Sequence, residues 1–143
     1  YSNVYGPRQN PHGEAGVVAI FCEKMNAGQA PTIFGDGKQT RDYVHVADVV
    51  RANLAALRYP QSGTFNVGTG QETDVLTIFS ALNAAYGNRF VAQHAPARVG
   101  ELPRNVLSIE RAGAVLQWRP ERTLNEGLAE TVAWYQDRIP SQA

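Results

Sequence analysis

From residue 35 to residue 48 the chain reads Gly35-Asp36-Gly37-Lys38-Gln39-Thr40-Arg41-Asp42-Tyr43-Val44-His45-Val46-Ala47-Asp48. A turn with two glycines leads into a short polar stretch, an alternating run and the start of a helix. Arg41 stands beside this turn, where its planar guanidinium could hold an anionic ligand through two parallel hydrogen bonds. The alternative for Arg41, and for Arg98 in a later loop, is a surface arginine paired with Asp42 or Glu101. These residues alone leave both interpretations open.

The composition excludes several classes of protein. The 143 residues carry 13 basic and 13 acidic side chains, so the net charge is zero and no broad nucleic-acid-binding surface is expected. No apolar run approaches the roughly 20 residues that span a bilayer, so we expect no membrane partner. The single cysteine, Cys22, excludes an intrachain disulfide and fits a reducing compartment, which predicts a cytoplasmic location.

The spacing of apolar residues predicts a mixed α/β domain over residues 1–143. The opening stretch, Tyr1 to Tyr5, has no initiating methionine and is typical of the end of a strand, so we expect part of a larger protein to be missing. The predicted strands are too short and too few for a complete doubly wound sheet. Glycine stops, caps and periodicity predict helices over 14–27, 49–59, 75–86, 108–116 (with Ser108 as N-cap) and after a Thr123–Glu126 capping box, and strands over 32–34, 42–46, 64–67 and 90–95.

Several other motifs are better explained by structure than by chemistry. Gly68-Thr69-Gly70 lies between a predicted strand and helix, but the third glycine of a dinucleotide-binding loop would fall on Thr73. A tight turn is therefore the better interpretation. The three histidines have no metal-ligand spacing, and Cys22 lies within an apolar helical stripe, where a buried, inert thiol is expected. We predict no metal site and no catalytic residue in this chain.

Six segments, in order along essentially the whole chain, carry a resemblance to a known family. They are Tyr1 to Gln9, Glu14 to Phe21, Gly35 through Val50, Phe65 to Gly70, Arg98 to Glu101 and Leu116 to Pro120. Taken together, they resemble the substrate-binding part of the NAD-dependent sugar-nucleotide epimerases and dehydratases, the extended short-chain dehydrogenases/reductases, which include UDP-glucose 4-epimerase. The resemblance implies a small mixed α/β substrate-binding domain that lacks most of the Rossmann domain.

The resemblance assigns one group of residues to the diphosphate of a nucleoside-diphosphate sugar such as a UDP-sugar. Asn3 would contact phosphate or sugar oxygens. The backbone at Gly16 and Val17 would meet the pyrophosphate at the positive end of a helix dipole. Arg41 and Arg98 would hold the two phosphates from opposite sides.

A second group would surround the nucleoside, again by resemblance. Thr32 and Phe34 would border the base, with Phe34 supplying an apolar face. Gln39 would form a hydrogen bond near the ribose, and Glu101 would accept hydrogen bonds from the ribose hydroxyls. Together with the diphosphate group, these nine residues make up the predicted substrate site.

The catalytic features of the family are absent from the sequence. The chain has neither the Gly-x-x-Gly-x-x-Gly cofactor loop nor a Tyr-x-x-x-Lys pair. The resemblance therefore implies that NAD binds to an N-terminal Rossmann domain of the parent enzyme, that this chain alone binds no cofactor, and that it is inactive in isolation. Exposed apolar surface would then promote self-association. Two alternatives stay open: a stand-alone, non-catalytic module that binds sugar nucleotides or a protein, and the substrate half of a sugar-nucleotide 4,6-dehydratase.

Overall fold

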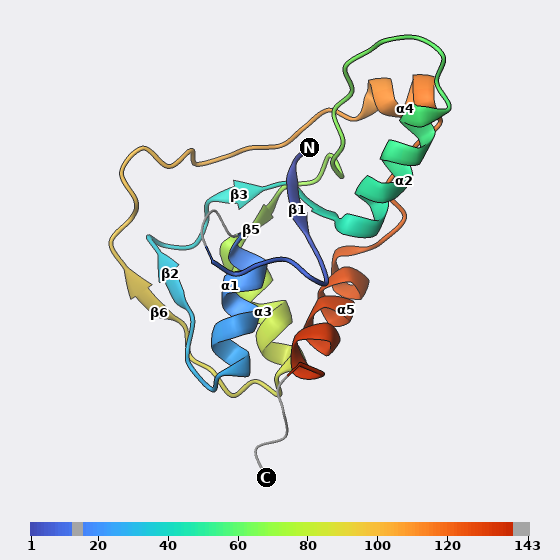
Figure 1. Ribbon diagram of the computed structural model, residues 1–143. Helices are drawn as coiled ribbons and strands as arrows, with labels where there is room; N and C mark the ends of the chain where they lie inside the picture. The colour runs from blue at the N-terminus through green and yellow to red at the C-terminus, as the bar shows by residue number, and fades with distance from the viewer. Residues whose placement is uncertain (13–15, 139–143) are drawn as a thin grey trace.

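A computed structural model of the protein describes residues 1–12 and 16–138 (Figure 1). Helices α1, α3 and α5 lie side by side, whereas α2 and α4 project away from them. No helix within the described residues is long and apolar enough to cross a bilayer. In chain order the elements are β1 Asn3–Tyr5, α1 Val17–Asn26, β2 Thr32–Phe34, β3 Thr40–Arg41, β4 Tyr43–His45, α2 Val46–Leu57, β5 Thr73–Asp74, α3 Val75–Ala85, β6 Gln93–Ala95, α4 Glu110–Leu116 and α5 Leu124–Gln136.

The strands of the described chain form three short pairs. Strand β1 pairs with β4 and β2 with β6, both in parallel, whereas β3 and β5 are antiparallel. In the first pair Asn3 lies opposite Tyr43 and Tyr5 lies opposite His45. The expectation of a mixed α/β domain with few, short strands is confirmed.

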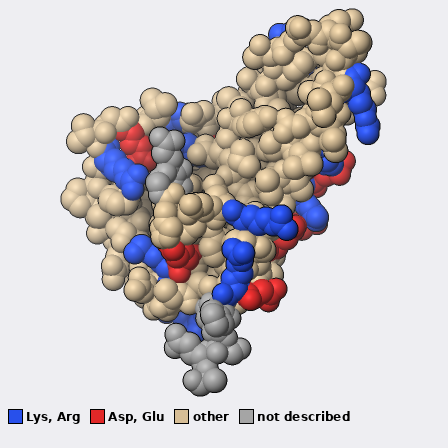
Figure 2. All heavy atoms as spheres, viewed as in Figure 1, with Lys and Arg blue, Asp and Glu red and all other residues tan. Residues whose placement is uncertain are grey.

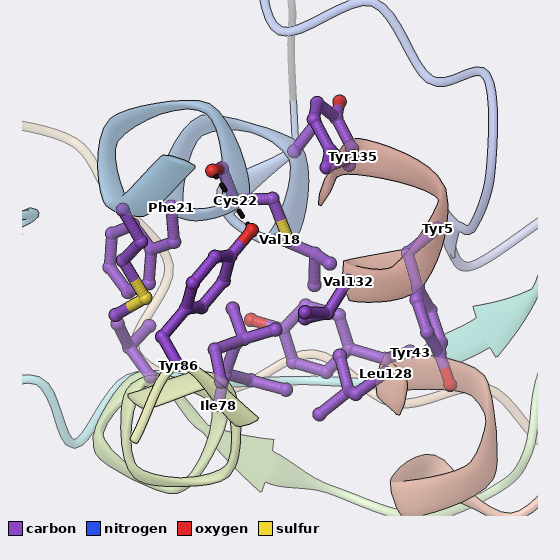
Figure 3. Close-up of a cluster of buried hydrophobic side chains, with 14 of the residues drawn as sticks. Tyr5, Val18, Phe21, Cys22, Tyr43, Ile78, Tyr86, Leu128, Val132 and Tyr135 are labelled. Carbon is purple, nitrogen blue, oxygen red and sulfur yellow. Dashed lines mark hydrogen bonds between the residues drawn. The ribbon is translucent and has the colours of Figure 1, made fainter. Parts of the chain in front are cut away.

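Alternation along β4 separates two hydrophobic cores. Because successive side chains of a strand point to opposite faces, Tyr43 packs into one core and Val44 into the other. The main core lies among α1, α3 and α5, where Figure 3 shows the Tyr86 hydroxyl directed at the main-chain oxygen of Cys22, 3.4 Å away. The second core joins α2 to α4 and consists of Val44, Val49, Ala52, Val67, Ala112 and Trp118.

Several local predictions are confirmed by backbone geometry. Gly28 follows the end of α1 with φ of 73° and Gly87 follows α3 with φ of 77°, a left-handed conformation that glycine adopts without steric cost. The side chains and backbones of Thr123 and Glu126 form the reciprocal capping box of α5. Cys22 is fully buried, and this burial raises the pKa of its thiol to about 12, as an inert thiol requires.

Other local predictions were wrong. Residues 64–67 form no strand, and Val67 receives only a hydrogen bond from the backbone of Ser2. Ser108 does not cap α4, which follows Ile109 without any side-chain cap. The strand predicted over 90–95 shrinks to β6, and β3 and β5 were not predicted. The predicted beginning of the first helix at residues 14 and 15 lies outside the described residues, and within them α1 begins at Val17.

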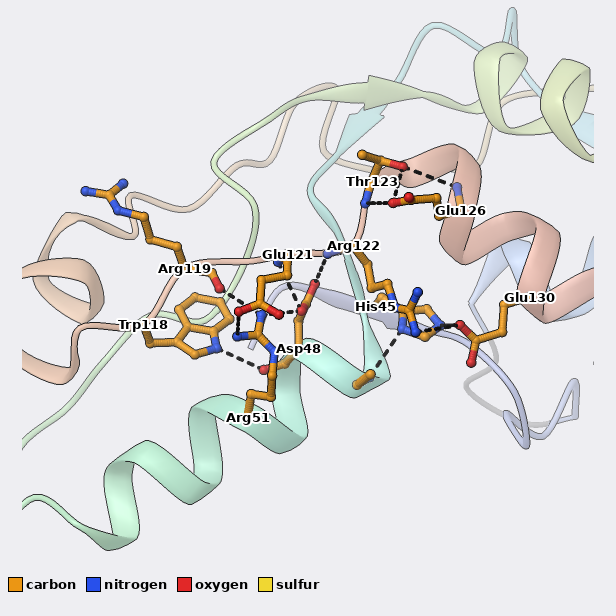
Figure 4. Close-up of polar contacts among 11 residues, drawn as sticks. His45, Asp48, Arg51, Trp118, Arg119, Glu121, Arg122, Thr123, Glu126 and Glu130 are labelled. Carbon is orange, nitrogen blue, oxygen red and sulfur yellow. Dashed lines mark hydrogen bonds and ion pairs between the residues drawn. The ribbon is translucent and has the colours of Figure 1, made fainter.

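His45, at the end of β4, is buried. Its Nδ1 accepts a hydrogen bond from the Ala47 N–H at the start of α2, so the neutral ring carries its proton on Nε2. The ring meets Tyr5 edge-on, with ring centroids 5.4 Å apart. Nε2 lies 3.9 Å from Glu130 Oε2, with no hydrogen-bond partner (Figure 4).

Burial of His45 predicts a pH-dependent stability. Desolvation lowers the pKa of its imidazole; Arg122 lowers it further, and Glu130 and Asp48 oppose the shift. Because the unfolded chain then binds a proton more readily than the folded one, the free energy of unfolding should fall as the pH drops below about 6.5. Urea unfolding between pH 5 and 8 tests this. A His45→Asn variant should flatten the dependence, whereas His12→Asn, at an exposed histidine, should retain it.

Candidate functional site

A pocket of about 260 Å³ lies between the start of α1, strands β2 to β4 and the loop that follows β6. All nine residues of the predicted substrate site line it, although they come from five separate segments of the chain. The predicted lining residues are Asn3, Gly16, Val17, Thr32, Phe34, Gln39, Arg41, Arg98 and Glu101, and the others are Ile20, Phe21, Ile33, Tyr43 and Val75.

The N-terminus of α1 forms part of the lining of this pocket. Its N-cap, Gly16, offers no side-chain hydrogen bond, and the first turn contains no acidic residue. The helix dipole and the first backbone N–H groups therefore favour a negative charge here. A Cβ at position 16 would lie 3.2 Å from the Gln9 side-chain amide, so glycine at this position also avoids that close contact.

Arg41, on β3, also lines the pocket. Its Nη1 donates hydrogen bonds to the main-chain oxygens of Thr40 at 2.7 Å and Leu102 at 2.8 Å. Its Nη2 donates to Glu101 Oε1 at 3.2 Å. The pairing with Glu101 that the sequence left open is therefore present, and the pairing with Asp42 is not. Arg41 is held in the pocket wall and keeps only part of its hydrogen-bonding capacity for a ligand.

Arg98 and Phe34 meet on the remaining side. The Arg98 guanidinium carbon lies 4.2 Å from the centre of the Phe34 ring, within the range of a cation–π contact. Gln39 Nε2 donates a hydrogen bond to the Phe34 main-chain oxygen at 3.0 Å. Phe34 therefore contacts both Gln39, predicted to lie near a ribose, and Arg98, predicted to hold a phosphate.

The residues that carry Arg98 and Glu101 form a strap, which we define as residues 96–107. Backbone hydrogen bonds join Thr40 to Pro103 and Asn105, and the guanidinium of Arg104 binds Glu72 at 2.6 and 2.9 Å. Hydrogen bonds from Arg104 and Thr40 lower the pKa of Glu72 to about 2. The strap therefore runs along the edge of the molecule from β6 towards α4, attached near its C-terminal end (Figure 1).

The structure also shows the roles of Tyr43, of the Gly68–Gly70 turn and of possible metal ligands. Tyr43 lines the pocket, where burial raises the pKa of its hydroxyl to about 12; the alternating run predicted a strand here but no place in the site. In the Gly68–Gly70 turn, the N–H groups of Thr69 and Gly70 bind the Asp42 carboxylate. Among the described residues no group of three His, Cys, Asp or Glu side chains could hold a metal ion.

Comparison with known proteins identifies the relatives of this arrangement. Residues 1–68 match the model of the NAD dependent epimerase/dehydratase family. The chain is 49% identical over 138 residues to the UDP-glucose 4-epimerase of Mycolicibacterium smegmatis, covering 96% of this chain and 44% of that protein. Most of the chain is therefore similar to NAD-dependent epimerases and dehydratases.

Solved structures of family members share the fold. The UDP-glucose 4-epimerase of Thermotoga maritima with UDP-glucose superposes with a TM-score of 0.92 at 46% identity, over 96% of this chain and 44% of that one. The Thermus thermophilus UDP-glucose 4-epimerase complex with NAD gives a TM-score of 0.86 at 41% identity, over 97% of this chain and 46% of that one. The chain thus spans somewhat less than half the length of the relatives that it matches.

Proposed function

We propose that this chain binds the nucleoside-diphosphate part of a sugar nucleotide, as the substrate half of an NAD-dependent epimerase similar to UDP-glucose 4-epimerase. The observation that carries the proposal is the convergence of two arginines, an uncapped helix N-terminus and an aromatic ring on one pocket. The comparisons support it, because the Thermotoga maritima relative is a UDP-glucose 4-epimerase with UDP-glucose.

The pocket suggests how each part of the ligand is held. Arg41, Arg98 and the start of α1 come from different segments of the lining, so a diphosphate bound there could meet two arginines and a helix N-terminus. Each arginine–phosphate hydrogen bond would contribute about 1.5–3 kcal/mol. Phe34 would supply the apolar face for a base, and Gln39 and Glu101 the polar contacts to the ribose. The cavity is smaller than most ligand pockets, which suits part of a sugar nucleotide.

NAD belongs, in this proposal, to a part of the parent enzyme outside this chain. The Gly68–Gly70 turn does not fit a dinucleotide, because the N–H groups of Thr69 and Gly70 already bind Asp42. When bound in the parent, the cofactor would carry the hydride. This chain would bind the nucleotide and orient the sugar, which lowers the barrier by positioning. By itself it should neither bind NAD nor convert UDP-glucose.

The surface is consistent with a small-molecule ligand and a protein partner. Figure 2 shows basic side chains scattered among acidic ones on the visible face, without the broad basic area that nucleic acid requires. Val50, Leu54 and Leu57 are 51%, 48% and 82% exposed and follow the i, i+4, i+7 spacing of one helical stripe on α2. We propose that this stripe contacts the Rossmann half of the parent, and that it promotes self-association when that half is missing.

Calorimetric titration with UDP tests the nucleotide site. Arg41→Ala should weaken binding by about tenfold or more, since it removes a charge-assisted contact to phosphate. Arg41→Lys should recover only part of the loss, because an ammonium lacks the planar fork.

The matched control is Arg51→Ala. Arg51 also binds a main-chain oxygen and carboxylates, through Arg119, Asp48 and Glu121, but it lies outside the pocket. Its loss should leave UDP affinity unchanged. Equal affinities for all four proteins would contradict the assigned role of Arg41. Parallel titrations with UDP-glucose and dTDP-glucose would distinguish the nucleoside.

A further inference from the structure

Asp42 carries a buried carboxylate that binds two distant segments of the chain. It is 1% exposed. Its Oδ1 accepts hydrogen bonds from the Thr69 N–H at 2.8 Å and the Thr69 hydroxyl at 2.6 Å. Its Oδ2 accepts from the N–H groups of Gly70 at 3.0 Å and Leu107 at 3.5 Å. A buried charge is tolerated only when it is bonded in this way, and backbone N–H groups are well suited to hold one.

Asp42 lies next to residues that line the pocket, although its carboxylate binds residues outside the lining. Its sequence neighbours Arg41 and Tyr43 both line the pocket, and its main-chain oxygen accepts a hydrogen bond from the Asn3 N–H at 2.9 Å. Leu107 is the last residue of the strap that carries Arg98 and Glu101. Asp42 therefore connects β1, β3 and the base of the strap without touching the cavity itself.

The turn opposite Asp42 is shaped to receive the carboxylate. A Cβ added at Gly68 would come within 2.5 Å of Asp42 Oδ2 and 3.0 Å of the Ser2 hydroxyl oxygen. Only glycine permits this close approach. The Gly68–Gly70 turn thus forms an anion-binding concavity, and the anion that occupies it is the side chain of Asp42.

Asp48 provides a natural comparison, because it is another buried carboxylate 1% exposed. Its Oδ1 accepts from Arg51 Nη2 at 2.6 Å and from the Glu121 N–H at 3.1 Å, and its Oδ2 accepts from the Arg122 N–H at 3.2 Å (Figure 4). It therefore binds residues 121 and 122, which do not line the substrate pocket. The two aspartates differ in what they position.

We propose that Asp42 is a positioning residue that fixes the strap, and with it Arg98 and Glu101, relative to the pocket wall at Arg41. The effect on ligand affinity rests on the proposed nucleotide site, but the effect on the strap does not. Asp42→Asn replaces an acceptor oxygen with an NH₂ group, which faces N–H donors and cannot accept from them. The strap should then lose its hydrogen bond at Leu107, while it keeps its contacts with Thr40, Arg41 and Glu72.

Two measurements on Asp42→Asn and Asp48→Asn test the proposal at a temperature where circular dichroism shows both to be folded. The first is the rate of trypsin cleavage after Arg98, within the strap. Asp42→Asn should accelerate it about tenfold, and Asp48→Asn should leave it unchanged, because opening of a segment exposes it to protease. The second is the UDP dissociation constant, which should rise about tenfold only in Asp42→Asn.

Equal cleavage rates in the two variants would overturn the proposal, as would an unchanged UDP affinity in Asp42→Asn. Failure of the unaltered chain to bind UDP would contradict the nucleotide site, while the cleavage rates would still decide the role of Asp42. If Asp42→Asn does not fold, Thr69→Val removes a single hydrogen bond to the carboxylate. It should also accelerate cleavage after Arg98, by less than the factor expected for Asp42→Asn.

Discussion

Trp118→Ala should lower the free energy of unfolding by about 3–5 kcal/mol, the range for removing a large aromatic side chain from a core. Trp118 is 3% exposed and is the largest residue of the second core. Its indole Nε1 also donates a hydrogen bond to the main-chain oxygen of Asp48 at 3.0 Å (Figure 4). The substitution would remove both the packing between α2 and α4 and this hydrogen bond.

Urea unfolding of the variants measures this loss. The free energy of unfolding of Trp118→Phe should lie between those of the unaltered chain and Trp118→Ala. Phenylalanine keeps a ring in the core but cannot donate the hydrogen bond to the Asp48 oxygen. Trp134→Ala is the matched control. Trp134 is only half-buried and stacks with Arg138, whose guanidinium carbon lies 4.3 Å from its ring centre, so its loss should be less costly. Equal losses of unfolding free energy in Trp118→Ala and Trp134→Ala would contradict a separate second core.

The features that sequence predicted well are set by a few neighbouring residues. The capping box of α5 requires only Thr123 and Glu126, three positions apart, and the ends of α1 and α3 require only the glycines that follow them. Periodicity likewise located the apolar stripes of these helices. Such signals depend only on neighbouring residues, so they can be recognised without knowing how the rest of the chain folds.

The wrong predictions depended on contacts between distant residues. Residues 64–67 have the composition of a strand, but no neighbouring strand pairs with them beyond the Ser2–Val67 hydrogen bond. Strands β3 and β5 are only two residues each and exist because they pair with each other. Alternation predicted that His45 lies on one face of its strand but not that α5 covers it. Strand formation and burial are tertiary properties that propensity does not fix.

The candidate site shows the same division. Nothing in spacing or composition brings Asn3, Phe34 and Arg98 together, and only the ordered resemblance to a family grouped them. The structure places them around one pocket. The resemblance nevertheless missed Asp42, whose partners lie 27, 28 and 65 residues further along the chain. A residue that acts by holding other segments has no signature in its own neighbourhood.

Gly127→Ala should lower the free energy of unfolding by up to about 3 kcal/mol, although alanine is the better helix former. Gly127 lies in α5 against the pair of rings formed by Tyr5 and His45. A Cβ there would collide with the Tyr5 hydroxyl oxygen and would lie 2.9 Å from the adjoining ring carbon and 3.0 Å from His45 Cδ2. Tyr5 is 3% exposed and His45 2%, so neither ring has space to move away.

The matched control for this prediction is Gly113→Ala in α4. A Cβ at Gly113 would have its nearest neighbour at 3.5 Å, in the flexible side chain of Arg119, so only the gain in helix propensity of up to about 1 kcal/mol should remain. Combining Gly127→Ala with Tyr5→Phe removes the closest colliding atom and should recover part of the loss, a coupling that urea unfolding of the double-mutant cycle would measure. If Gly127→Ala were as stable as Gly113→Ala, the close packing of α5 on β1 would be wrong.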